Sequence, residues 1–452
     1  MAIQQRDELR FAATGDAILT RELLAYEGNS PRFDGMLRLL READVAATNL
    51  EVLVHDYDNY PAAASGGTFM RAPPAVLDEL AGAGCNLFSA ATNHAFDFSH
   101  GGVETTLAEL RRRDLAAAGL GNTLYEARRP AYLETPAGRV AMVSTCTSIT
   151  PGSEAGAQSP TLPGRPGINP LHVDEVYRIP SDALDALRTV SESARIEAMK
   201  ESWLERGLYF NHDWNDPEYF HFGDMKFEVA DGGETGLAYS LDEDDIAAVT
   251  DWIGDARSNA DFVVAAIHGH QGVDGRETTT ETPEFVTRFA HAAIDAGADV
   301  VVGHGPHVLR GVELYQGRPI FYSLGNWIVQ NETVERLPPE SFARYGLDDP
   351  TKVSDVFDAR LFDEAGEPKG DLANEEFWMT VVPTCRFVEG TLVEIALHPV
   401  TLQRRAGCPQ RGIPVLATGA EATDILQRVA ERSSVFGTDV VVDGEVGRIE
   451  PA

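Results

Sequence analysis

Short apolar runs alternate with helix-patterned segments along much of this chain, and this alternation constrains the fold more than any other feature. Between residues 9 and 146 the strand-length runs cover 9–16, 44–51, 85–94 and 139–146, and the helical segments cover 31–43, 74–84 and 104–114. Apolar runs of that length are typical of buried strands, and apolar residues three and four apart are typical of amphipathic helices. The pattern therefore predicts a layered α/β domain with a largely buried sheet.

The alternation stops in the middle of the chain. A Pro/Gly-rich segment there leads to a predicted helix at 182–205, and then to an aromatic, acidic run from Tyr209 to Phe222 that contains His212 and His221. Structureless loops of this length are unusual inside compact domains, so we expect residues 151–240 to form an insertion that covers a functional edge as a lid. A satellite hydrophobic cluster is the alternative interpretation of the aromatic run.

The α/β pattern resumes after the insertion. Strand-like runs cover 261–270, 299–307 and 318–326, and helices are predicted at 245–257 and 283–296. These segments and the first ones together predict a discontinuous core of residues 1–150 and 241–330.

A C-terminal extension, residues 331–452, follows this core. It begins with an acidic, loop-rich stretch and then contains two strand-like runs, 377–387 and 391–400, which read as a hairpin. We expect a helix at 423–432 to end the fold.

The chain is strongly acidic. Its formal net charge is −34, and nearly all of its 37 cationic side chains are Arg. Because it contains no basic stripe or tail, the sequence argues against nucleic acid or an anionic membrane as a partner. A negative, Lys-poor surface also suits concentrated salt, so we expect a salt-adapted, halophilic source.

This interpretation predicts that thermal stability increases as salt is raised to molar concentrations, because salt screens the repulsion between surface carboxylates. Melting curves recorded across that range measure the effect. A flat or falling melting temperature would remove the argument.

Hydropathy and cysteine usage favour a cytoplasmic protein. No apolar stretch approaches the roughly 18 residues that cross a bilayer, and the first ten residues lack the cationic and apolar regions of a secretory signal. We therefore expect no integral membrane segment. Cys85, Cys146, Cys385 and Cys408 are far apart and form no CxxC pair, which predicts isolated, mostly buried thiols.

Polar residues recur where the predicted strands end. They are Asp16, Asn49, Glu51, Asn93, His94, His268 and His304, and His307 follows in the segment Val-Gly-His-Gly-Pro-His. Taken singly, each could be a turn, a helix cap or a hydrogen-bonded core residue. At the carboxyl ends of parallel strands, however, they would converge on one site. Carboxylate, amide and imidazole groups suit a divalent cation that activates water or polarises a carbonyl or phosphoryl oxygen.

Six short motifs occur in the order and rough spacing of one family. They are Gly15-Asp16, Asn49-Leu50-Glu51, Asn93-His94-x-x-Asp97, His268-Gly269, Gly303-His304-Gly305-Pro306-His307 and Tyr322-Ser323-Leu324-Gly325-Asn326. Over residues 9–150 and 245–330 the chain resembles the CapA-type (poly-γ-glutamate capsule biosynthesis) family, which is similar to the calcineurin-like metallophosphoesterases. The resemblance implies a calcineurin-like α/β sandwich, layered α/β/β/α, with an insertion and a C-terminal extension that completes it.

The resemblance also implies roles for individual residues. It implies that one or two divalent ions, with Mn, Fe or Zn expected, are held by Asp16, Glu51, Asn93, His268, His304 and His307. Glu51 would take the place of the bridging carboxylate, with Asn49 as the alternative. His94 would transfer protons as a catalytic residue, and Asp97 would either share in catalysis or only cap a helix or orient His94.

The chain also departs from the family pattern. Ile18 stands where phosphoesterases of this fold have a second ligand His, Gly305 replaces a frequent third His, and His270 is an additional imidazole. We assign substrate binding to Arg165, Asn169, His270 and Asn326. Arg165 could clamp a substrate carboxylate through its planar guanidinium, although a rigid Pro/Gly turn explains its segment equally well.

These features predict a metal-dependent, hydrolase-like enzyme that acts on poly-γ-glutamate or a related anionic, peptide-like polymer, with partners in a polymer-synthesis complex. The alternatives are a metal-dependent phosphoesterase, a peptide epimerase and a non-catalytic polymer-binding subunit. Neither a nucleophile elbow nor a phosphate-binding glycine loop is present in the sequence, so ATP-dependent ligation by this chain alone has no support.

Overall fold

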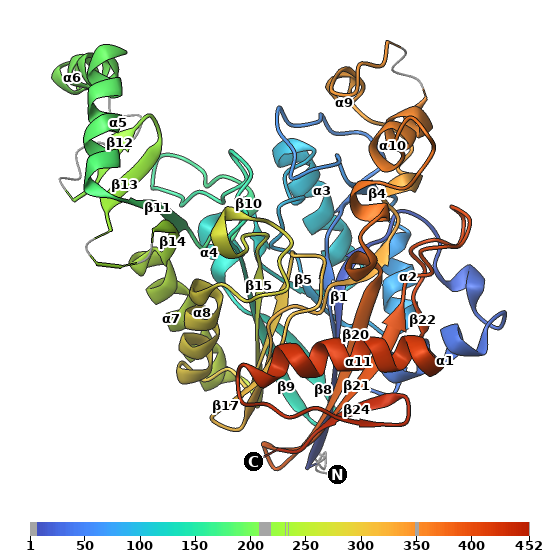
Figure 1. Ribbon diagram of the computed structural model, residues 1–452. Coiled ribbons are helices and arrows are strands. Elements are labelled where there is room, and N and C mark those ends of the chain that lie inside the picture. The colour runs from blue at the N-terminus through green and yellow to red at the C-terminus, as the bar shows by residue number, and fades with distance from the viewer. Residues whose placement is uncertain (1–6, 208–217, 231, 234, 349–351, 452) are drawn as a thin grey trace.

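The computed structural model describes residues 7–207, 218–230, 232–233, 235–348 and 352–451. It is a mixed α/β structure with two large sheets at its centre and helices around them (Figure 1). The mixed α/β class predicted from the sequence is therefore confirmed. Most of the aromatic run from residue 209, including His212, lies outside the described residues.

The larger sheet has ten strands and is built around β1 (Glu8–Ile18). On one side of β1 the strands β2 (Val45–Leu50), β5 (Leu87–Ser89) and β6 (Ala116–Ala118) follow in parallel. On the other side lie β20 (Met379–Val388), β21 (Thr391–Thr401), β22 (Val415–Leu416), β24 (Val446–Ile449) and β23 (Val441–Asp443), all paired in antiparallel order. β19 (Asn326–Val329) pairs in parallel with the end of β1. Strands from both ends of the chain therefore meet at β1.

The smaller sheet has six strands, in the order β17 (Val312–Tyr315), β18 (Arg318–Phe321), β16 (Val300–His304), β15 (Phe262–His268), β9 (Gly138–Cys146) and β8 (Ala131–Thr135). β15 and β16 are buried along their whole length. Strands covered on both faces must be apolar throughout, which explains why these two read as continuous apolar runs.

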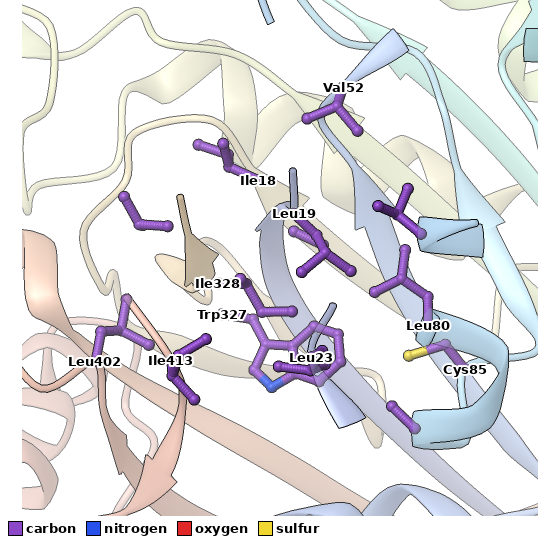
Figure 2. Packing of buried hydrophobic residues seen from close by; sticks show 14 of the residues in the cluster. Ile18, Leu19, Leu23, Val52, Leu80, Cys85, Trp327, Ile328, Leu402 and Ile413 are labelled. Atoms are coloured by element: carbon purple, nitrogen blue, oxygen red, sulfur yellow. The ribbon is translucent and has the colours of Figure 1, made fainter. Parts of the chain in front are cut away.

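The two sheets pack against each other through apolar side chains. Phe11 of β1 and Phe262 of β15 lie in one buried cluster with ring centroids 5.8 Å apart. On the outer face of the larger sheet, α1 (Pro31–Arg41) and α2 (Val76–Ala83) contribute to a second cluster that includes Trp327 (Figure 2). α7 (Glu243–Asn259) and α8 (Glu284–Asp295) cover the smaller sheet.

Further elements complete the core. They are α3 (Ser99–Arg112), α4 (Leu124–Arg128), and the two-residue strand pairs β3 (Leu53–Val54) with β4 (Arg71–Ala72) and β7 (Leu120–Gly121) with β10 (Gly167–Ile168). Among the described residues, no helix is both long and apolar enough to span a bilayer. The four cysteines are free, and all but Cys408 are buried, as the sequence predicts.

The insertion forms a sheet of its own. Its strands run in the order β12 (Phe220–Phe222), β13 (Met225–Val229), β11 (Val173–Ile179) and β14 (Gly236–Leu241). The single helix predicted at 182–205 is wrong, because Arg195 has φ 61° and divides it into α5 (Ser181–Ser193) and α6 (Ile196–Glu205). These helices and α9 (Pro339–Ala343) with α10 (Val353–Leu361) extend beyond the sheets at the end away from the chain termini (Figure 1).

The expectation that a helix ends the fold is also wrong. α11 (Gly419–Ser434) is followed by the hairpin of β23 and β24, which extends the larger sheet at its edge. The two-residue turn of this hairpin is Gly444-Glu445, because Asp443 pairs with Val446, and Gly444 has φ 63°. Glycine at the first position of a two-residue loop is typical of tight β-hairpins, because that position takes a positive φ.

One ion-pair group joins the start of the insertion to the core, and it yields a pH prediction. His172 Nδ1 lies 2.5 Å from Asp245 of α7, and its Nε2 lies 3.1 Å from Glu154. These two carboxylates raise the pKa of His172 to about 10, and Asp245 has the larger effect. Because the folded-state pKa is raised, the stabilisation is complete below the usual pKa of about 6.5 and is lost as the pH rises through about 10.

An NMR titration should therefore find His172 still protonated at pH 8. His398 is the internal control, because burial, aided by Arg448, lowers its pKa to about 4. A His172 signal that titrates near 6.5 would contradict the ion-pair assignment.

Candidate metal centre

Polar side chains gather where the parallel strands of both sheets end. Asp16 on β1 lies in register with Asn49 of β2 and with Asn326 of β19. In the smaller sheet, His268 at the end of β15 lies opposite His304 at the end of β16. The carboxyl ends of the strands thus bring together residues that are far apart in the sequence, as expected for sheets of this type.

Two local details differ from the sequence prediction. Asp16 does not end its strand, because pairing with β19 extends β1 to Ile18 and the register shifts just after Asp16. Asn93 and His94 do not end theirs either, since β5 stops at Ser89 and both residues lie in the turn that follows.

One set of candidate ligands consists of Asp16, Glu51 and His307. Their ligand atoms all lie within 4.8 Å of one another. His307 Nδ1 is 3.3 Å from Asp16 Oδ2, and His307 Nε2 is 3.8 Å from Glu51 Oε1. Two carboxylates and one imidazole within this distance are a suitable set of ligands for a divalent cation.

A second set shares Glu51 with the first and adds His268 and His270. His268 Nε2 lies 3.8 Å from Glu51 Oε1 and 2.9 Å from Asn93 Oδ1. Asn93, predicted as a ligand, therefore adjoins the second set. Glu51 belongs to both sets.

The environment of the Glu51 side chain indicates that a cation fits this site. It is fully buried, and neither carboxylate oxygen has a hydrogen-bond partner within the described part of the chain. Burial is the main cause that raises the pKa of Glu51 well above its usual value, and the nearby carboxylate of Asp16 raises it further. A buried, unpaired carboxylate is costly, and a bound cation would compensate it directly.

The two histidines of the Gly-His-Gly-Pro-His segment differ in environment. Burial alone would lower the pKa of His307, but the carboxylates of Glu51 and Asp16 outweigh it and raise the pKa to about 9. His304 Nε2 lies 3.2 Å from the carbonyl oxygen of Thr14, and burial lowers its pKa. Its Nδ1 is buried and makes no hydrogen bond to the described residues, so that lone pair stays available to a cation.

His94 and Asp97 form a pair beside the candidate ligands. His94 Nδ1 is 2.7 Å from Asp97 Oδ2, which also accepts a hydrogen bond from the backbone N–H of Met70 at 2.7 Å. The residue that caps α3 is Phe98, so Asp97 does not cap that helix. Its buried carboxylate instead holds the imidazole of His94 in one orientation.

Several supporting contacts were not predicted from the sequence. Asn49 Nδ2 donates a hydrogen bond to Asp16 Oδ1 at 2.9 Å and lies 3.2 Å from His268 Nδ1. The backbone N–H of Gly305 donates to Asp16 Oδ2 at 3.2 Å. The family resemblance indicates Asn49 only as an alternative bridging ligand, although an Asn on a strand beside a candidate ligand is also typical of an orienting role.

The four predicted substrate-binding residues have different surroundings. His270 belongs to the second ligand set, and Asn326 Oδ1 lies 2.8 Å from His307 Nδ1. Arg165 is about half exposed and donates from Nε to the carbonyl oxygen of Glu154 at 2.9 Å. Asn169 is fully buried and donates to the carbonyl oxygen of Ser144 at 2.9 Å.

Fold and site define a class of protein: a two-sheet α/β protein with carboxylates and imidazoles clustered where its parallel strands end. The chain matches the family described as bacterial capsule synthesis protein PGA_cap over residues 10–331. This is well over half of the 452 residues, and the chain belongs to this family. The resemblance predicted from the six motifs is thereby confirmed.

The chain is also similar to individual proteins. The chain is 32% identical over 453 residues to "Uncharacterized protein y4sH" of Sinorhizobium fredii (strain NBRC 101917 / NGR234), a match that covers 98% of this chain and 93% of the relative. It is 23% identical over 372 residues to "Capsule biosynthesis protein CapA" of Bacillus anthracis, covering 81% and 70%. It is also 26% identical over 247 residues to "Probable polyglutamine synthesis accessory protein Rv0574c" of Mycobacterium tuberculosis (strain ATCC 25618 / H37Rv), covering 54% and 45%.

Proposed function

We propose that this chain is a metal-dependent enzyme on a calcineurin-like α/β/β/α sandwich, and that it acts on poly-γ-glutamate or a related peptide-like polymer. The observation that carries the proposal is the buried carboxylate of Glu51, which is unpaired among the described residues and lies between two sets of candidate ligands. The capsule-related names of the family and of its relative CapA support the choice of polymer.

The proposed site holds one or two divalent ions through Asp16, Glu51, Asn93, His268, His304 and His307. A bound ion would supply Lewis acidity, by which water is activated or a carbonyl oxygen is polarised. His94 transfers a proton to or from the reacting group through its free Nε2, while Asp97 fixes the imidazole through Nδ1. Arg165 has an exposed guanidinium that suits a substrate carboxylate, and Asn326 orients His307.

The proposed domain plan follows from the same family resemblance. Residues 1–150 and 241–330 form the core, residues 151–240 form the insertion that serves as a lid, and residues 331–452 complete the sandwich. The pairing of β20 with β1 supports the role of the C-terminal extension, since it places that extension in the same sheet as Asp16.

Elemental analysis of protein purified without a His-tag tests the proposal. We expect one or two metal equivalents in the native protein and a loss of metal in a folded His304→Ala/His307→Ala double variant, because two imidazole ligands are removed. The matched control is His398→Ala, whose imidazole bonds to Thr384 on the larger sheet and should leave the metal content unchanged. Native protein without metal, even after incubation with Mn²⁺, Fe²⁺ or Zn²⁺, would favour the binding-subunit alternative.

Substrate assays then separate the remaining alternatives. Cleavage of γ-glutamyl polymer supports the proposal, turnover of a phosphodiester supports the phosphoesterase, and deuterium uptake from heavy water into a peptide supports the epimerase. Whichever reaction is found, His94→Ala should reduce its rate by about 100-fold or more, the usual effect of removing a general acid or base.

A further inference from the structure

We propose that His270 is a ligand of the second cation position, which it forms together with Glu51 and His268. This inference rests on the proposed function and deepens it, because it adds an imidazole to the proposed ligands of the metal site. His270 departs from the family pattern, and the resemblance to known proteins gives it no role.

The first support is the position of the imidazole. The ligand atoms of His270, His268 and Glu51 all lie within 4.8 Å of one another. The ring centroid of His270 is 5.2 Å from that of His268 and 4.9 Å from that of His307. The ring of His270 therefore lies beside residues of both candidate ligand sets, with Glu51 common to the two.

The second support is an unused nitrogen. Nε2 of His270 is buried and has no hydrogen-bond partner among the residues that the structure describes. A buried imidazole nitrogen without a partner costs free energy unless something binds it. The two oxygens of Glu51 are in the same condition, and one cation would satisfy both residues.

The third support is that the backbone around His270 is held on both sides. Its own N–H donates to Ser148 Oγ at 2.7 Å, and the N–H of Gly269 donates to the carbonyl oxygen of His304 at 3.0 Å. The next residue, Gln271, accepts from Thr147 Oγ1 at 2.8 Å through its side chain. Metal ligands are usually fixed in this way by neighbouring hydrogen bonds.

A buried arginine adds a further anchor to the same loop. Arg310 donates from Nε to the carbonyl oxygen of Thr279 at 3.0 Å and from Nη2 to that of Gln271 at 3.2 Å. It is only 2% exposed. These hydrogen bonds connect the loop after β15 to the segment that follows His307. They hold the loop that carries His270 in a fixed position beside Glu51.

His304 occupies a different position. It belongs to neither ligand set within the described residues, and its Nε2 faces the carbonyl oxygen of Thr14. A position built from Glu51, His268 and His270 would offer two imidazoles and one carboxylate to a cation. That ligand set suits Zn²⁺ or Fe²⁺.

Cobalt(II) is a suitable probe, because its visible absorption depends on the number and type of its ligands. Metal-free, full-length protein is titrated with Co²⁺ while absorbance and binding stoichiometry are recorded. We expect the native protein to bind two equivalents and His270→Ala to bind its second equivalent at least about tenfold more weakly, with a changed spectrum. His291→Ala is the matched control, since His291 pairs with Glu313 on the smaller sheet, 3.0 Å away.

The outcomes distinguish this inference from the proposed function. Two equivalents and an unchanged spectrum in folded His270→Ala would overturn the role of His270 and leave the metal-dependent function standing. Native protein that binds no Co²⁺ would overturn both. His270→Gln, which keeps a polar side chain, replaces the Ala variant if circular dichroism shows that His270→Ala does not fold.

Discussion

Adding Mn²⁺ or Zn²⁺ to metal-free protein is expected to raise its melting temperature, and Glu51→Gln is expected to abolish that rise. A ligand that binds only the folded state stabilises it by about 4 kcal/mol when its concentration is about 1,000 times its Kd. Glu51 belongs to both candidate ligand sets, so its carboxylate is the group whose loss affects both positions. Melting curves with and without metal measure the difference.

The Gln variant itself should fold. Gln has nearly the volume of Glu, and removal of a buried carboxylate that is unpaired among the described residues relieves an electrostatic cost in the metal-free state. Glu104→Gln on the exposed face of α3 is the control and should keep the full response to metal. An undiminished response in Glu51→Gln would show that the ion binds elsewhere.

Gly15→Ala is expected to destabilise the protein by about 3 kcal/mol or more and to weaken metal binding at the same time. A Cβ on Gly15 would lie 1.9 Å from the carbonyl oxygen of Gly325 and 2.8 Å from its carbonyl carbon. Both are backbone atoms of the segment next to β19, so the clash cannot be relieved by a side-chain rotation. The same carbonyl oxygen accepts the N–H of Asp16 at 2.9 Å, which is why the strain reaches a candidate ligand.

Gly254→Ala is the matched control for this substitution. Gly254 lies within α7, and the nearest atom to a Cβ there is 4.0 Å away. Ala is a better helix former than Gly, so stability should rise by about 0.5 to 1 kcal/mol. Chemical denaturation of the three proteins measures both effects, and a Gly15→Ala variant as stable as the native chain would contradict the close approach of β1 and β19.

The sequence predicted the core elements well because buried strands and helices have characteristic patterns of apolar residues. Residues 139–146 and 261–270 read as strands and form β9 and β15, since strands covered on both faces are apolar throughout. The insertion was harder, because its strands are only partly buried: β13 has four half-buried residues and no fully buried one. Its four-stranded sheet was therefore missed.

The sequence could indicate candidate residues for the site but not its geometry. Polar residues at strand ends identified Asp16, Glu51 and His268, because parallel strands necessarily end at one edge. A sequence contains no distances between residues that are far apart in the chain. It therefore could not show that the ligand atoms of His270, Glu51 and His268 lie within 4.8 Å of one another. It also could not show that Arg165 faces Glu154, since that contact depends on how the insertion folds back.

The pairing of β1 has a consequence for the order in which this protein can be made. The first half of β1, from Glu8 to Ala12, pairs with β20, and its last residues, from Asp16 to Ile18, pair with β19. In a growing chain that ends before residue 379, the first half of β1, from Glu8 to Ala12, therefore lacks its partner on that edge. Such contacts between distant parts of the sequence form late, and an uncovered edge can pair with other chains.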